Sequence, residues 1–137
     1  MTNHTEVNHE GESINKRKLG TDKEELAARY LKERGVKMLE KNFRCRQGEI
    51  DLIYRDGEYL VFCEVKYRSN NKNGTAMDAV GITKQRKICR VAEYYRMIHH
   101  LGDLTPIRYD VMARQGDQVT WIRNAFQHQK GRASYAR

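Results

Sequence analysis

The chain has 137 residues and a mass of 16.1 kDa, which leaves room for one hydrophobic core and excludes a multidomain enzyme. Hydrophobic residues make up 39% and charged residues 32%, a balance typical of soluble proteins rather than of disordered or membrane proteins. No apolar stretch approaches the roughly 20 residues that cross a bilayer, and the polar N-terminus lacks the apolar centre of a secretory signal. We therefore expect a cytoplasmic protein without a membrane partner.

The charge of the chain favours a polyanionic partner. Lys and Arg number 26 against 18 Asp and Glu, which gives a formal net charge of +8 and a pI near 9.5. The first eighteen residues are neutral and the last thirteen carry +3, so +5 remains on the body of the chain. Nucleic acid is the expected partner of such a surface. A basic protein that binds nothing specific, or one that meets an acidic protein, has the same balance.

Hydrophobic spacing and turn residues predict the elements in chain order. Residues 1–18 have almost no large apolar side chains, so we expect a disordered tail. A helix is predicted from Thr21 or Asp22, either of which can cap it, to Gly35. Residues 36–42 then form a short extended connection.

A β-meander is predicted over residues 43–66. Its strands run from Ile50 to Tyr54 and from Tyr59 to Tyr67, and the tight turn 55–58 joins them. The second strand is apolar enough to be central in a sheet, apart from two charged residues. A polar loop over 69–75 follows.

The last third of the chain predicts a long helix over 77–100 and two strands over 107–114 and 119–124. The resulting order α-β-β-α-β-β is typical of a mixed α/β domain. We assign this domain to residues 19–124 and a basic C-terminal tail to 125–137.

The meander carries the residues that favour chemistry. Glu49 and Asp51 lie two residues apart and share one face of a strand, as Glu64 and Lys66 do on the next strand. If the two strands pair through their tight turn, the acids and the lysine can converge. Carboxylates with a lysine are what metal-assisted phosphodiester hydrolysis requires, since carboxylate oxygens hold Mg²⁺ and an ammonium stabilises developing charge.

A structural salt bridge is the alternative interpretation of the same residues. An acid within the apolar run around Glu64 is costly to bury unless it meets a metal or a counter-charge. In this alternative Glu64 pairs with a cation such as Arg44, while Asp51 faces water. Elsewhere, Asp110 follows Arg108 in a predicted strand and is expected to form a structural ion pair with it.

Basic side chains are also predicted near the meander and on one face of the second helix. Such residues can follow a phosphate backbone, although a charged helix face is also typical of a solvated surface. The candidate nucleic-acid-binding residues are Arg44, Arg46, Arg68, Lys84 and Lys87.

Asp51, followed thirteen residues later by Glu64-Val65-Lys66, matches the PD-(D/E)xK nuclease pattern. More narrowly, GEIDLI over 48–53 and VFCEVKYR over 61–68, with an upstream helical Glu24, resemble the UPF0102 family of uncharacterised bacterial proteins. That family is similar to archaeal Holliday-junction resolvases and to restriction-endonuclease-like nucleases. The resemblance covers about residues 19 to 124.

The resemblance implies a restriction-endonuclease-like α/β fold, with a mixed central β-sheet flanked by helices. It implies a Mg²⁺-dependent endodeoxyribonuclease, with Mn²⁺ as a substitute metal and branched DNA as a candidate substrate. Position by position, Asp51, Glu64 and the Val65 carbonyl would be the metal ligands and Lys66 the catalytic lysine. Glu24 would be the helical acid that completes the site.

Three further expectations accompany the resemblance. Glu49 shares the face of Asp51 and would contact the metal ligands rather than the metal. Resolvase-like relatives act as dimers, which makes a homodimer the expected assembly. The alternative to a nuclease is a nucleic-acid-binding module that keeps the fold but performs no chemistry.

Overall fold

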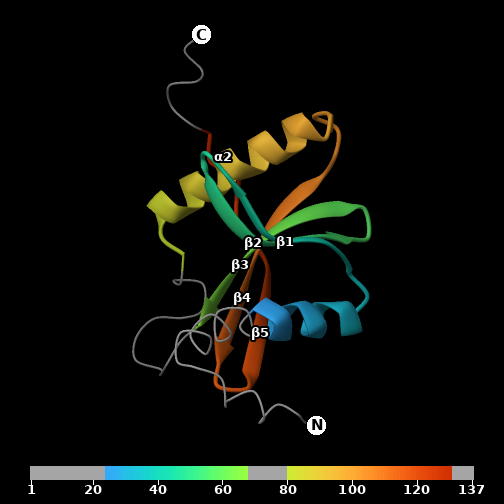
Figure 1. Cartoon of the computed structure of the whole chain (residues 1–137), viewed down its shortest axis with the longest axis vertical. Coiled ribbons are helices and arrows are strands. Elements are labelled where there is room, and N and C mark those ends of the chain that lie inside the picture. Colours follow the sequence, from blue (N-terminus) through green and yellow to red (C-terminus); the bar gives the residue numbers. More distant parts are fainter. Residues whose placement is uncertain (1–23, 68–79, 131–137) are drawn as a thin grey trace, which may run out of the picture.

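The computed structural model describes residues 24–67 and 80–130, and one mixed five-stranded sheet is its centre. The strands lie in the order β1-β2-β3-β4-β5 (Figure 1). All neighbouring strands are antiparallel except β3 and β4, which are parallel and are connected through helix α2. The elements are β1 Lys37–Cys45, β2 Gly48–Asp56, β3 Tyr59–Tyr67, α2 Ile82–Ile98, β4 Ile107–Gln115 and β5 Gln118–Phe126, preceded by a first helix that includes residues 24–33.

The two helices cover opposite faces of the sheet (Figure 1). Ile53 and Phe62 pack with residues of α2, whereas Leu52 and Val61 pack with Leu31 of the first helix. This division follows from strand geometry, because successive side chains point to opposite faces. The predicted α/β class, with a mixed sheet between helices, is confirmed.

The predicted connection over 36–42 is wrong, because most of it belongs to β1. This strand pairs with β2 from Lys37↔Arg55 to Cys45↔Gly48, with a bulge between Met38 and Glu40. β1 is an edge strand whose side chains are all at least partly exposed. Charged residues therefore replace the apolar alternation by which the central strands were predicted.

The ends of two other elements differ from their predicted positions. Helix α2 ends at Ile98 instead of residue 100, since His100 adopts a left-handed φ of 56°. β5 extends to Phe126, two residues past the predicted limit of the domain. The predicted tail 1–18, the loop 69–75 and residues 131–137 of the basic tail lie outside the described residues.

Asp110, on β4, is buried in the core, and its predicted ion pair with Arg108 is confirmed. Its fully buried carboxylate accepts hydrogen bonds from Arg108 at 2.9 Å, the Tyr54 hydroxyl at 2.6 Å, the Trp121 indole at 2.9 Å and the Asn124 amide at 2.9 Å. Desolvation alone would raise the pKa of Asp110, but these donors outweigh it and lower that pKa. The network therefore holds a charged carboxylate in the interior.

Neither helix in the described part of the chain has the length and hydropathy needed to cross a membrane.

Candidate active site

The site is built where β2 and β3 separate. Their pairing runs from Asp56↔Tyr59 to Leu52↔Cys63 and stops there, although both strands continue. Beyond the last pair, the backbone N–H of Val65 donates a 2.8 Å hydrogen bond to Oδ2 of Asp51. A side-chain carboxylate thus bridges the two strands at the point where the backbone ladder ends.

Asp51 and Glu64 lie on neighbouring strands at this point, which we call the fork. The Asp51 carboxylate accepts its hydrogen bond from Val65, the residue that follows Glu64. Asp51 is 8% exposed and Glu64 is 9% exposed. The structure therefore places two buried carboxylates side by side on neighbouring strands, and Asp51 does not face open water.

The cation nearest to Glu64 comes from α2. Nζ of Lys84, in the first turn of that helix, lies 3.2 Å from Oε2 of Glu64. Arg44 instead pairs with Glu49 at 3.1 Å, and both of those side chains are exposed. Glu64 thus has the counter-charge that the salt-bridge alternative requires, supplied by Lys84 rather than by Arg44.

Lys66 stands at the open end of the site. It follows Glu64 by two residues on β3, so both belong to the same face, and its side chain is exposed. Its backbone remains in the sheet, opposite Ala113 of β4. A rigid strand therefore carries an ammonium group toward solvent beside a buried carboxylate.

Glu24 is buried, 8% exposed, and its Oε1 accepts a 2.6 Å hydrogen bond from Nδ2 of Asn42. Asn42 has a left-handed φ of 57° within β1, a conformation that Asn tolerates better than most residues. Within residues 24–67 and 80–130, no group of three or more His, Cys, Asp or Glu could hold a metal ion. Glu24 thus forms no such group with Asp51 and Glu64.

The donor set at the fork fits a hard divalent cation. Asp51, Glu64 and the Val65 carbonyl supply only oxygen atoms, and Mg²⁺ is commonly held by one or two carboxylates while it keeps several waters and phosphate oxygens. Two buried carboxylates on adjacent strands, one of them held in place by a backbone N–H, satisfy that requirement.

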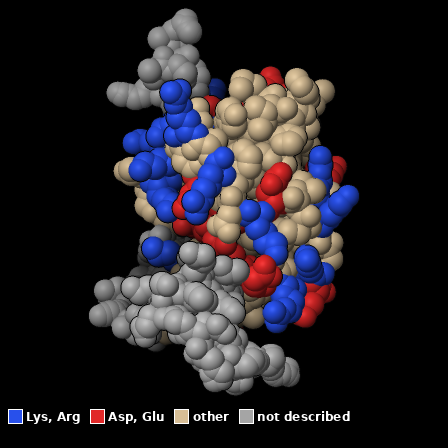
Figure 2. All heavy atoms as spheres, in the orientation of Figure 1, with Lys and Arg blue, Asp and Glu red and all other residues tan. Residues whose placement is uncertain are grey.

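Exposed basic residues lie on the two elements next to the fork, the β1–β2 hairpin and α2. Figure 2 shows Lys and Arg gathered over the beginning of α2 and the β1–β2 hairpin, beside acidic atoms. Arg46 is exposed in the turn between β1 and β2, and Lys87 is exposed on α2. Arg86 and Arg90 are exposed on the same helix. Arg68, which was also predicted to bind nucleic acid, lies outside the described residues.

Sequence reasoning assigned no role to Asn42 and assigned Lys84 to phosphate binding alone. The signal for Asn42 was available, since an Asn within a charged edge segment is a residue type that adopts positive φ. The ion pair of Lys84 could not be derived, because it depends on how α2 packs on β3.

A mixed sheet with a helix on each face, and a carboxylate pair where two strands separate, defines a restriction-endonuclease-like α/β domain. The chain belongs to UPF0102, an uncharacterised protein family whose model matches residues 23–113. This confirms the family resemblance found in the sequence.

Bacterial relatives in this family resemble the chain over most of their length. A UPF0102 protein of Lachnoclostridium phytofermentans is 45% identical over 113 residues, which covers 82% of this chain and 96% of the relative. A UPF0102 protein of Aeromonas hydrophila is 48% identical over 104 residues, covering 75% and 80%. One from Legionella pneumophila is 43% identical over 105 residues, covering 75% and 89%. The names of these relatives state no activity.

Proposed function

We propose that this protein is a metal-dependent nuclease that hydrolyses DNA phosphodiester bonds in the cytoplasm. The observation that carries the proposal is the pair of buried carboxylates, Asp51 and Glu64, at the fork between β2 and β3. Burying two acids side by side is unfavourable unless cations compensate them. A site of this kind is costly to maintain for packing alone, which favours a functional role.

Three residues at the fork would together hold Mg²⁺, or Mn²⁺ in its place. Asp51 and Glu64 would supply carboxylate oxygens, and Val65 would supply its carbonyl. The Val65 N–H fixes the orientation of the Asp51 carboxylate through its 2.8 Å hydrogen bond. When bound, the cation supplies a more acidic water and screens the charge of the phosphodiester.

Lys66 would act on the reacting phosphate from the exposed end of β3. Its ammonium group can orient the attacking water or stabilise the charge that develops on the phosphate oxygens. Because the neighbouring backbone is paired with β4, the base of this side chain is held rigidly. The basic residues around the fork, among them Arg46 and Lys87, would position the DNA backbone.

A cleavage assay with matched variants tests this function. Labelled linear, flapped and four-way-junction DNA is incubated with Mg²⁺, Mn²⁺ or EDTA. We expect metal-dependent products from the wild type and a loss of at least about 100-fold in rate for Asp51→Asn, since the variant removes a ligand charge. Glu58→Gln is the control, because Glu58 is an exposed acid in the turn between β2 and β3, at the opposite end of this strand pair from the fork. Equal activity of Asp51→Asn and the wild type would falsify the mechanism.

A binding module without catalysis is the second candidate, and one observation favours it. Lys84 already compensates Glu64 from within the chain, at 3.2 Å. Salt-sensitive DNA binding with no products under any metal condition would support this candidate over the nuclease.

A further inference from the structure

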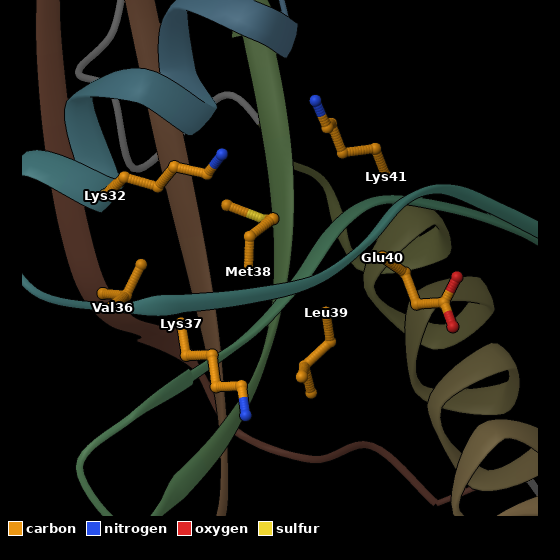
Figure 3. Close-up of a pocket in the computed structure, with 7 residues that line it drawn as sticks. All are labelled: Lys32, Val36, Lys37, Met38, Leu39, Glu40 and Lys41. Carbon is orange, nitrogen blue, oxygen red and sulfur yellow. The ribbon is translucent and has the colours of Figure 1, made fainter.

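A groove at the free edge of the sheet lies apart from the carboxylate fork. It has a volume of about 450 Å³ and is lined by Lys32 of the first helix and by residues 36–41. Figure 3 shows Lys32, Met38 and Lys41 on one side of the β1 ribbon and Lys37 and Leu39 on the other. Cationic side chains therefore flank the edge of the strand on both sides.

The groove has an excess of positive charge that the described residues do not neutralise. Its lining contains three lysines and one acid, Glu40. Lys41 is bonded to Glu25 at 2.8 Å, but no ion pair is found for Lys32 or Lys37 within residues 24–67 and 80–130. Both of these lysines are exposed. An anionic ligand would meet two uncommitted ammonium groups here.

The form of the edge disfavours a peptide strand as the occupant. β1 contains a bulge between Met38 and Glu40, and Leu39 has no partner in the register with β2. Bulges and edge lysines are features by which proteins prevent another strand from pairing with an exposed edge. The same lysines favour phosphate groups, which need charge but no backbone register.

The groove lies on the same β1–β2 hairpin as Asp51. Lys37 is opposite Arg55, which is four residues along β2 from Asp51, and Lys32 lies on the first helix beside β1. Exposed Arg46, beyond the end of β1, continues the basic edge on the other side.

We propose that the groove beside β1 binds the phosphate backbone of duplex DNA, with Lys32 and Lys37 as the contacts. This inference rests on the proposed function and adds a second point of attachment. It makes the substrate a nucleic acid with a double-stranded segment that reaches this edge of the sheet.

The test is fluorescence anisotropy with a labelled duplex of about 16 base pairs, titrated in EDTA at several salt concentrations. For Lys32→Gln/Lys37→Gln we expect binding to weaken on the order of tenfold, and the slope of log K against log salt to fall by about two. The control is Arg29→Gln/Lys130→Gln, which removes the same charge from exposed residues outside this groove. We expect the control to keep the wild-type slope.

Glu40→Gln tests the same site with the opposite sign. It removes the acid of the groove, so we expect tighter binding and no loss of salt slope. If the lysine variant and its control weaken binding equally, the groove is not a phosphate site, although the nuclease proposal stands. If the wild type itself binds no duplex, the groove proposal fails, and the cleavage assay alone decides the nuclease proposal.

Discussion

The buried acids Asp110, Asp51 and Glu64 each lie beside hydrogen-bond donors or a cation. Asp110 is fully buried and keeps its charge because four neighbouring groups donate hydrogen bonds to it. Asp51 and Glu64 are nearly as buried, and the contacts of their carboxylates include the Val65 amide and the Lys84 ammonium. Asp110 thus lies in a network of donors inside the core, whereas the acids at the fork lie close to the exposed end of β3 that carries Lys66.

The Asp110 network should make stability depend on acid pH. Because the folded pKa of Asp110 is lowered, the unfolded chain takes up the proton first as pH falls. The stabilisation is complete at a pH above about 3.9, the pKa of this carboxyl in the unfolded chain. It is lost progressively as the pH falls from there through the lower pKa of the folded state. We expect Asp110→Asn to cost about 3 kcal/mol near pH 7 and clearly less near pH 3, as measured by urea unfolding.

Asp103→Asn is the control for this experiment. Asp103 is fully exposed and lies 3.9 Å from Arg96, so its loss should change the free energy of unfolding by less than about 0.5 kcal/mol. An equal cost of Asp110→Asn at both pH values would show that its charge does not stabilise the fold.

The elements differ in how far the sequence predicts them. The apolar central strands β3 and β4 were predicted within a residue of their observed ends, because burial on both faces leaves few polar positions. β1 was missed because an edge strand with exposed lysines lacks that signal. Likewise, Asp51 and Glu64 were found from their spacing, whereas the pairing of Glu64 with Lys84 joins elements that only tertiary packing brings together.

The link between α2 and β3 predicts a metal-dependent stability. Lys84→Gln removes the cation from Glu64, and we expect a loss of about 1 kcal/mol in EDTA, since the lysine is half exposed. Mg²⁺ should restore more stability to this variant than to the wild type, because the metal no longer competes with an ammonium group.

Thermal unfolding with EDTA and with Mg²⁺ measures this difference, and Lys84→Arg serves as the charge-preserving control. If Mg²⁺ raises the melting temperature of Lys84→Gln no more than that of the wild type, Lys84 and the metal do not share Glu64.

At the scale of the whole molecule, the face shown in Figure 2 carries two groups of Lys and Arg, with acidic atoms between and among them. On the proposed function, the net charge of +8 would attract nucleic acid over a distance, and the carboxylates at the fork would act on it. A single copy has one such fork, so a junction with two strands to be cut requires two copies.

We therefore expect a homodimer if branched DNA is the substrate. Light scattering should give about twice the mass of 16.1 kDa for the purified chain alone, or the mass of two chains plus the DNA when a four-way junction is bound. A monomer under both conditions would contradict the junction-resolving version and leave a nuclease that cuts one strand at a time.

The backbone pairing between β2 and β3 ends before either strand does, and this divides the sheet into two parts. β3 pairs with β4 from Leu60 to Tyr67, but its pairing with β2 stops at Cys63. The β1–β2 hairpin, which carries Asp51, is thus paired with β3 over fewer residues than β4 is. Glu64 and Lys66 belong to β3 and therefore to the more extensively paired part of the sheet. The spacing of the two carboxylates is consequently set by how firmly the hairpin is held, and a DNA strand that pulls on β1 would act directly on that spacing.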